Sequence, residues 1–254
     1  EILNLLKHGK KSAGEITQAF SITAAAIGGT ALTGGVGMVA GSIAVAFPLG
    51  VMSGIHVSEY ARDNWLVRVI RIMTSNLSGV PSIVFGLFGM ALFVRTLGFG
   101  DSIIAGSLTL ALLVLPIVIR TTEEAMRSID NSLRNGSYAL GATKLQTVWR
   151  VLLPMAFPNI VTGLILSIGR VSGETAPILF TAAAYFLPKL PDSIFDQVMA
   201  LPYHLYVIAT SGTDLEASRP MAYGTALVLI AIVLLINLLA NGLRRYFGRK
   251  VKTN

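Results

Sequence analysis

The sequence of 254 residues contains no cysteine, three scattered histidines and few charged side chains. The absence of cysteine excludes disulfides and thiolate metal sites, although it leaves the redox compartment open. His8, His56 and His204 lack the spacing of metal ligands, so no metal site is expected. The chain also lacks the Gly-x-x-x-x-Gly-Lys-Ser/Thr motif of a phosphate loop. We therefore expect no ATP bound in that way and no cofactor bound by this chain.

The residues that are present are typical of a membrane protein. Hydrophobic residues make up 53% of the chain, charged residues make up 13%, and the mean hydropathy is +0.69. This composition is too apolar for an ordinary soluble domain. A net charge of +7 would suggest a nucleic-acid partner in a soluble protein, but in a membrane protein the positions of the charges matter more. We expect an all-α, polytopic protein that contacts membrane lipid and no nucleic acid.

The hydrophobic pattern predicts one transmembrane domain over residues 1–254, with five helices that cross the membrane. A hydrocarbon core about 30 Å thick takes about 20 helical residues to cross. The stretches that come close to this length are residues 34–56, 77–94, 102–119, 157–177 and 221–239.

The distribution of Lys and Arg predicts the orientation of these helices. Basic residues concentrate in the connection 121–156 and in the C-terminal tail 242–254, which the positive-inside rule places in the cytoplasm. The segment 1–23 and the net acidic loop 188–219 then lie outside. Five crossings that end inside place residue 1 outside, so we expect a further helix upstream of it.

Two opposite charges interrupt the fourth expected helix. Arg170 and Glu174 are its only ionised side chains. Each costs roughly 3 kcal/mol near the centre of a bilayer on insertion scales, so such residues normally carry function. Being four residues apart, they share a helix face and can pair. Gly169 and Gly173 predict close packing with another helix, and Pro177 is expected to end or kink the helix.

The cytoplasmic connection 121–156 is long and has a distinctive pattern. Gly136 and Gly141 separate stretches of strong helix formers in which apolar residues recur at helical spacing. This pattern predicts short amphipathic helices, the last of which is expected to end at Pro154. A docking element has this form, whereas a linker without a task would be shorter or more polar. The alternative is an amphipathic helix that lies on lipid.

This connection resembles the cytoplasmic signature loop of binding-protein-dependent ABC importer permeases. The order Asn-Gly-Ser, then Gly, Val and Leu-Pro follows that signature in its spacing, although the family begins it with Glu-Ala-Ala. The resemblance implies that the loop packs into a cleft on an ATP-binding subunit. The residues expected to couple to that subunit are Asn135, Gly136, Ser137, Gly141, Ala142, Val151, Leu153 and Pro154.

Three further stretches, residues 80–88, 116–123 and 169–182, resemble the PstA-type phosphate permeases, which have the type I importer fold. The resemblance implies six core helices in the inner membrane, in agreement with the upstream helix expected from the orientation. It also implies three kinds of partner: a second homologous permease, a homodimer of ATP-binding cassette subunits that holds the ATP and Mg, and an external phosphate-binding protein.

Within this resemblance, Arg120, Arg170 and Glu174 are expected to line the substrate pathway. Arg170 lies roughly 18 Å from the cytoplasmic end of its helix, and its guanidinium fork matches phosphate oxygens. Glu174 would hold Arg170 until an anion arrives. Alternatively, the pair only holds helices together, and Arg120 only anchors its helix at the headgroups.

Three functional hypotheses remain at this stage. The first is ATP-driven import of inorganic phosphate by a permease subunit that is not itself an enzyme. The second is the same architecture with another cargo, such as sulfate, molybdate or an amino acid. The third is a self-contained secondary transporter or channel, which should show inverted internal symmetry, and no internal repeat is visible in the sequence.

Overall fold

The computed structural model describes residues 32–61, 64–184, 191–211 and 215–252, and these are helical apart from connecting turns and one isolated bridge. The all-α prediction is therefore confirmed, while the expected external segment 1–23 lies outside the described residues. In chain order the elements, with η for a π-helical segment, are α2 (Leu32–Ile55), η2 (His56–Tyr60), α3 (Trp65–Leu77), α4 (Ser82–Gly89), η3 (Met90–Thr96), α5 (Ile103–Arg127), α6 (Asn131–Ala139), α7 (Lys144–Thr147), η4 (Val148–Leu152), α8 (Leu153–Ser172), α9 (Ala176–Leu179), α10 (Leu201–Thr210) and α11 (Leu215–Lys252).

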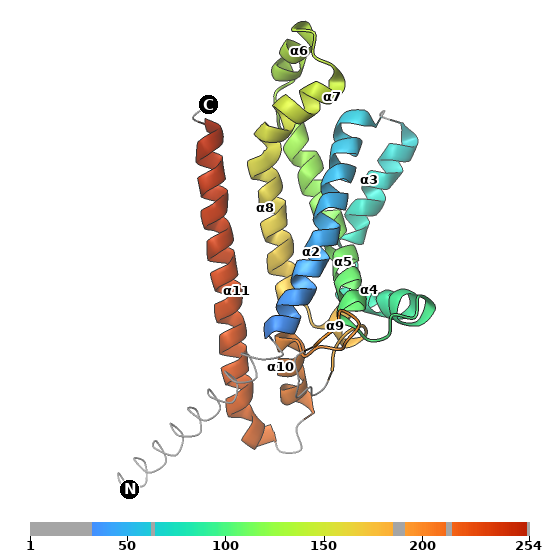
Figure 1. Cartoon of the computed structure of the whole chain (residues 1–254), viewed down its shortest axis with the longest axis vertical. Coiled ribbons are helices and arrows are strands. Elements are labelled where there is room, and N and C mark those ends of the chain that lie inside the picture. The colour runs from blue at the N-terminus through green and yellow to red at the C-terminus, as the bar shows by residue number, and fades with distance from the viewer. Residues whose placement is uncertain (1–31, 62–63, 185–190, 212–214, 253–254) are drawn as a thin grey trace, which may run out of the picture.

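Three long helices, α2, α5 and α8, form the centre of the molecule, and α11 stands beside α8 (Figure 1). The helices α2 and α5 run toward the end that carries α6 and α7, which we call the α6 end. Helix α8 returns toward the opposite end, which carries α9 and α10 and which we call the α9 end. Glycines let α2 approach α5 closely, because a Cβ at Gly54 would lie only 2.6 Å from the Thr122 Cβ.

Four of the five expected crossings are single long apolar helices in the structure. They are Gly35–Tyr60, Ile103–Arg127, Lys144–Ser172 and Arg219–Leu239. The second of these continues well past the expected boundary at residue 119, because the polar residues that follow are good helix formers. The fifth crossing belongs to α11, which also continues through most of the expected basic tail 242–254.

The second expected crossing, residues 77–94, is wrong as a single helix. The chain instead forms α3 and then bends by 102° into α4 and η3. The bend lies at residues 78–81, where Pro81 has no amide proton to donate and disfavours helix at the residue before it. With 13 residues, α3 is about 20 Å long, which is shorter than the hydrocarbon core of a bilayer.

The fourth expected crossing, residues 157–177, also differs at its end. Helix α8 stops at Ser172, and Gly173 is its C-cap. Pro177 therefore lies in the first turn of α9 and not at the end of the long helix. The chain then reaches the first turn of α5, where the Ser102 amide donates to the Thr181 carbonyl oxygen at 2.9 Å.

Part of the expected external loop 188–219 packs against the start of α5. The backbone amides of Ile103 and Ile104 donate to the carbonyl oxygens of Asp196 (2.9 Å) and Ile194 (3.0 Å). The first amides of a helix have no partner within it, so this loop satisfies two donors at the start of α5. Helix α10 follows and packs on α11.

Candidate translocation and coupling sites

The interruption of α8 carries the charged pair that the sequence singled out. The Arg170 Nε and the Glu174 Oε1 lie 3.4 Å apart, so the ion pair expected from the four-residue spacing is present. Their side chains are 35% and 16% exposed. Arg170 belongs to the last turn of α8, whereas Glu174 follows the helix in the gap before α9. The pair therefore bridges a helical end and an irregular segment.

This interruption lies near the middle of the bundle. Helices α5 and α8 cross where a Cβ on Gly163 would lie 2.7 Å from the Thr121 Cβ, so these two residues are at the same level. Arg170 follows Gly163 by seven residues, or about 10 Å, toward the α9 end. The adjacent Val171 packs in one cluster with Leu110 and other residues of the first half of α5. Helix α8 therefore ends beside the first half of α5, in a cluster that also holds Ile178 of α9.

The two glycines beside the pair differ in their surroundings. Gly169 lies against α11, where an added Cβ would be 3.1 Å from the Asn237 Oδ1. Gly173 is exposed, and within the described part of the chain an added Cβ would meet only the Arg170 carbonyl oxygen, at 4.0 Å. The close packing expected of both glycines is found at Gly169, while Gly173 ends the helix instead.

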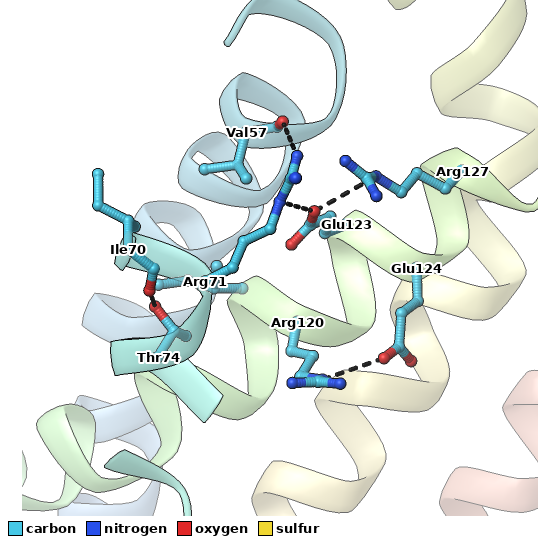
Figure 2. A pocket seen from close by; sticks show the side chains of 9 residues that line it. Val57, Ile70, Arg71, Thr74, Arg120, Glu123, Glu124 and Arg127 are labelled. Atoms are coloured by element: carbon cyan, nitrogen blue, oxygen red, sulfur yellow. Dashed lines mark hydrogen bonds and ion pairs between the residues drawn. The ribbon is translucent and has the colours of Figure 1, made fainter. Parts of the chain in front are cut away.

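A charged pocket of about 220 Å³ lies between α3 and α5, nearer the α6 end (Figure 2). Arg120, Glu123, Glu124 and Arg127 line it from α5, at spacings of three and four residues that share one helix face. Arg71 enters from α3. The Glu123 Oε1 lies 2.7 Å from the Arg71 Nε and 3.3 Å from the Arg127 Nε, so one carboxylate bridges two guanidinium groups.

Arg120 is the pocket residue that the sequence singled out. Its Nε lies 3.1 Å from the Glu124 Oε1, and both side chains are more than half exposed. Its guanidinium also contacts the Ser75 hydroxyl of α3. Arg120 is adjacent to Thr121, so it lies about 10 Å closer to the α6 end than Arg170 does. The structure thus places these two arginines at different depths.

The expected coupling loop folds as two short helices joined by a tight turn. Asp130 caps α6 by accepting a hydrogen bond from the Ser132 amide at 2.8 Å, and this bond lowers the pKa of the Asp130 carboxyl. The turn after α6 requires Gly141, whose φ of +83° lies in the left-handed region. Thr143 then starts α7 through a capping box with Gln146. The short helices predicted from the sequence are therefore present.

The role expected of Pro154 as a helix end is wrong. Pro154 lies in the first turn of α8, and the helical course runs without a break from Lys144 to Ser172. Proline is tolerated there because the π-helical segment η4 precedes it, where the α-helical hydrogen-bond pattern already changes. The second coupling helix is thus the beginning of the fourth crossing.

The tip of the coupling loop exposes apolar side chains. Leu140 is 90% exposed, and Leu145 and Trp149 are 60% and 55% exposed. Val148 and Leu152, which belong to the same apolar rhythm, are fully buried against α5 and α8. Exposed apolar patches are typical of interaction sites.

A buried arginine fastens this loop to the rest of the molecule. The Arg134 Nη2 lies 2.8 Å from the Glu59 Oε1 and 2.6 Å from the Met126 carbonyl oxygen, and its Nη1 lies 2.7 Å from the Ile129 carbonyl oxygen. The side chains of Arg134 and Glu59 are only 14% and 7% exposed. Lys144 adds a second link, with its Nζ 5.2 Å from the centre of the Tyr60 ring.

Sequence reasoning missed Arg134 and Glu59, as well as the pairing of Arg71 with Glu123. In each case the partners come from different helices and are far apart in the chain, so no spacing rule links them. The only sequence signal for such a pair was the presence of a basic and an acidic residue near two helix ends expected on the same side of the membrane.

Comparisons with known proteins agree with this architecture. The family model described as "Binding-protein-dependent transport system inner membrane component" matches residues 46–253. The chain is 38% identical over 221 residues to the probable ABC transporter permease protein YqgI of Bacillus subtilis (strain 168), covering 83% of this chain and 75% of that protein. It is 42% identical over 201 residues to the phosphate transport system permease protein PstA of Mycobacterium leprae (strain TN), covering 79% of this chain and 64% of that protein.

Solved structures show the same fold at low identity. A chain from the inward-facing MetNI methionine ABC transporter has a TM-score of 0.62 and 18% identity, with 85% of this chain and 92% of that chain covered. A chain from a bacterial ABC transporter involved in alginate import has a TM-score of 0.65 and 14% identity, with 85% and 78% covered. The chain therefore belongs to the binding-protein-dependent inner membrane components, the non-catalytic multi-pass permease subunits of ABC importers.

Proposed function

We propose that this chain is the PstA-type permease subunit of an ATP-driven importer of inorganic phosphate. The PstA relative from Mycobacterium leprae carries phosphate transport in its name and shares 42% identity over 79% of this chain. YqgI is named only as a probable ABC transporter permease, and this name gives no cargo. The assignment of phosphate as the cargo therefore also depends on the chemistry of the site. The observation that carries the proposal is the Arg170–Glu174 pair at the interruption of α8.

An interrupted helix with a charged pair near mid-depth is typical of a transport site. Irregular backbone at membrane depth is tolerated where protein buries it or where it lines a water-filled cavity. Transporters place substrate sites at such broken helices. Arg170 offers a planar fork of donors, which suits a phosphate group. Glu174 supplies a counter-ion at 3.4 Å when no anion is bound.

Polar side chains continue from this pair toward the α6 end. A pocket of about 320 Å³ between α5 and α8 is lined by polar side chains that include Thr121, Glu124, Asn159 and Thr162. Asn159 and Thr162 precede Arg170 by two to three turns of α8. A phosphate released from Arg170 would find hydroxyl and amide groups along this route, which supports a pathway over a purely structural pair.

The remaining parts of the proposal concern orientation and partners. The α6 end faces the cytoplasm, where the exposed tip around Leu140 docks into an ATP-binding cassette subunit that holds ATP and Mg. The α9 end faces outward and receives phosphate from an external binding protein. A second homologous permease completes the pathway. ATP-driven closure of the cassette dimer then moves the coupling helices and the crossings joined to them.

Transport by the purified complex in proteoliposomes tests the proposal. Wild-type complex should take up radiolabelled phosphate only with ATP and the external binding protein present, and sulfate, molybdate or amino acids should not compete. Arg170→Ala should abolish uptake, and Arg170→Lys should retain part of it because the charge remains without the fork. Arg95→Ala removes an exposed cation at the α9 end and serves as the control.

Two results would refute different parts of the proposal. Full phosphate uptake by assembled Arg170→Ala would show that the pair is structural. Uptake of sulfate or molybdate in preference to phosphate would keep the importer architecture and replace the cargo.

A further inference from the structure

The pocket between α3 and α5 holds more positive than negative charge. Three guanidinium groups and two carboxylates line it, which leaves one positive charge in excess. Glu123 and Arg127 follow Arg120 along α5 toward the α6 end, and Arg71 lies beside Glu123 (Figure 2), whereas Arg170 lies about 10 Å closer to the α9 end than Arg120 does. They are therefore separate from the pathway pair at the interruption of α8.

The ion pairs between the two carboxylates and the three arginines differ in how exposed they are. The pair of Arg120 with Glu124 is 53% and 64% exposed, and exposed pairs contribute little to stability, so an anion can displace Glu124 easily. Glu123 is only 13% exposed and bridges Arg71 and Arg127 through a single oxygen. That one oxygen contacts one donor on each guanidinium, and the Arg71 Nη2 also donates to the Val57 carbonyl oxygen at 3.4 Å. A guanidinium carries five N–H donors, so Arg127 can offer others to a further acceptor.

A phosphate group matches this arrangement better than a carboxylate does. It carries three or four oxygens and accepts bidentate hydrogen bonds from several arginines at once. The pocket volume of about 220 Å³ far exceeds the roughly 15 Å³ that one water needs, so a small oxyanion has room. Thr74 adds a hydroxyl to the wall.

We propose that this pocket is a phosphate-group binding site formed by Arg71, Arg120 and Arg127, with Glu123 as the carboxylate that occupies it when no ligand is bound. The inference rests on the proposed function only for placing the site on the cytoplasmic side. The phosphate group belongs either to inorganic phosphate on its way into the cytoplasm or to the headgroup of an anionic phospholipid in the inner leaflet.

Binding to the intact complex distinguishes these sources. The permease with its ATP-binding subunits is placed in phosphatidylcholine nanodiscs and carries Arg170→Ala, so that binding at the pathway pair is removed. If inorganic phosphate is the ligand, Arg71→Gln and Arg127→Gln should each weaken binding of radiolabelled phosphate by at least tenfold. Glu123→Gln should strengthen it several-fold, because the competing carboxylate is gone. Arg68→Gln is the matched control, an exposed arginine of α3 that does not line the pocket.

The lipid arm uses nanodiscs that contain phosphatidylglycerol. If a headgroup is the ligand, native mass spectrometry should show one retained phosphatidylglycerol that is lost in Arg71→Gln, and this lipid should displace labelled phosphate. Unchanged binding of both ligands in the Arg71→Gln/Arg127→Gln variant would overturn the proposal. If that double variant fails to assemble, unchanged binding of both ligands in Glu123→Gln would overturn the proposal. Normal transport by Arg170→Ala would refute the role of Arg170 in the substrate pathway. It would not change what the binding measurements show about the pocket between α3 and α5.

Discussion

Arg134 and Glu59 are 75 residues apart in the sequence, yet their side chains meet at 2.8 Å and are almost completely buried. Arg134 belongs to α6, and Glu59 belongs to η2 at the end of the first described crossing. Because Arg134 also binds carbonyl oxygens near the end of α5, one guanidinium joins the coupling loop to two crossings. A force applied to α6 is therefore passed directly to α2 and α5.

Arg134→Ala is predicted to uncouple ATP hydrolysis from transport. It leaves the Glu59 carboxylate buried without its partner, and breaking a buried pair in this way costs roughly 3–5 kcal/mol. We expect a lower melting temperature of the complex and fewer phosphate ions imported per ATP hydrolysed. Arg134→Glu combined with Glu59→Arg should restore part of the coupling, which a loss of general stability would not do. Wild-type coupling in assembled Arg134→Ala would contradict the role of this pair.

Leu140→Glu is predicted to weaken the attachment of the ATP-binding subunits. Leu140 is 90% exposed, so the substitution should not destabilise the permease itself. Burying a leucine in an interface contributes about 1.5–3 kcal/mol, and its loss should reduce co-purification of the ATP-binding subunits by tenfold or more. Ile194→Glu, at an exposed residue of the opposite end, is the control. Equal retention in both variants would exclude the tip as the docking surface.

Gly141→Pro is predicted to disturb the coupling turn more than Gly141→Ala does. The φ of +83° lies outside the range of proline, and proline also removes the amide that donates to the Tyr138 carbonyl oxygen at 2.9 Å. Alanine leaves this donor in place and costs about 1–2 kcal/mol in the left-handed region. The ratio of transport to ATP hydrolysis should therefore fall slightly with alanine and severely with proline. Equal ratios in the two variants would argue against this geometry.

Gly163→Ala is predicted to separate α8 from α5. An added Cβ would lie 2.7 Å from the Thr121 Cβ, so the helices must move apart, at a cost of roughly 1–3 kcal/mol. Thermal unfolding of the purified complex should show this loss, and Thr121→Ala should restore part of it. Gly37→Ala is the control, because no atom of the residues that the structure describes lies within 4 Å of an added Cβ there.

Features that depend on one continuous stretch of chain could be predicted from the sequence. The crossing in α5 followed from an unbroken apolar stretch, and the Arg170–Glu174 pair followed from a four-residue spacing. The coupling turn followed from Gly141, since a tight turn between two helices favours glycine.

Features that depend on contacts between distant segments could not be predicted in this way. The apolar stretch 77–94 is long enough to cross, and although Pro81 disfavours a continuous helix, nothing in the composition shows that the chain turns by 102° within this stretch. The bridging of Arg71 and Arg127 by Glu123 requires the relative positions of α3 and α5, which hydrophobic periodicity does not contain. The same is true of the level at which α8 ends, because a helix end is set by what the following segment packs against.

The bend between α3 and α4 has a consequence for the lipid annulus. Ser78 and Gly79 are exposed at this turn, and acyl chains cannot solvate the backbone of a turn at bilayer depth. Annular lipid should therefore be excluded from this flank, which leaves a neighbouring subunit or water to cover it. The surface of the permease beside this bend should therefore differ in its neighbours from a surface that contacts acyl chains.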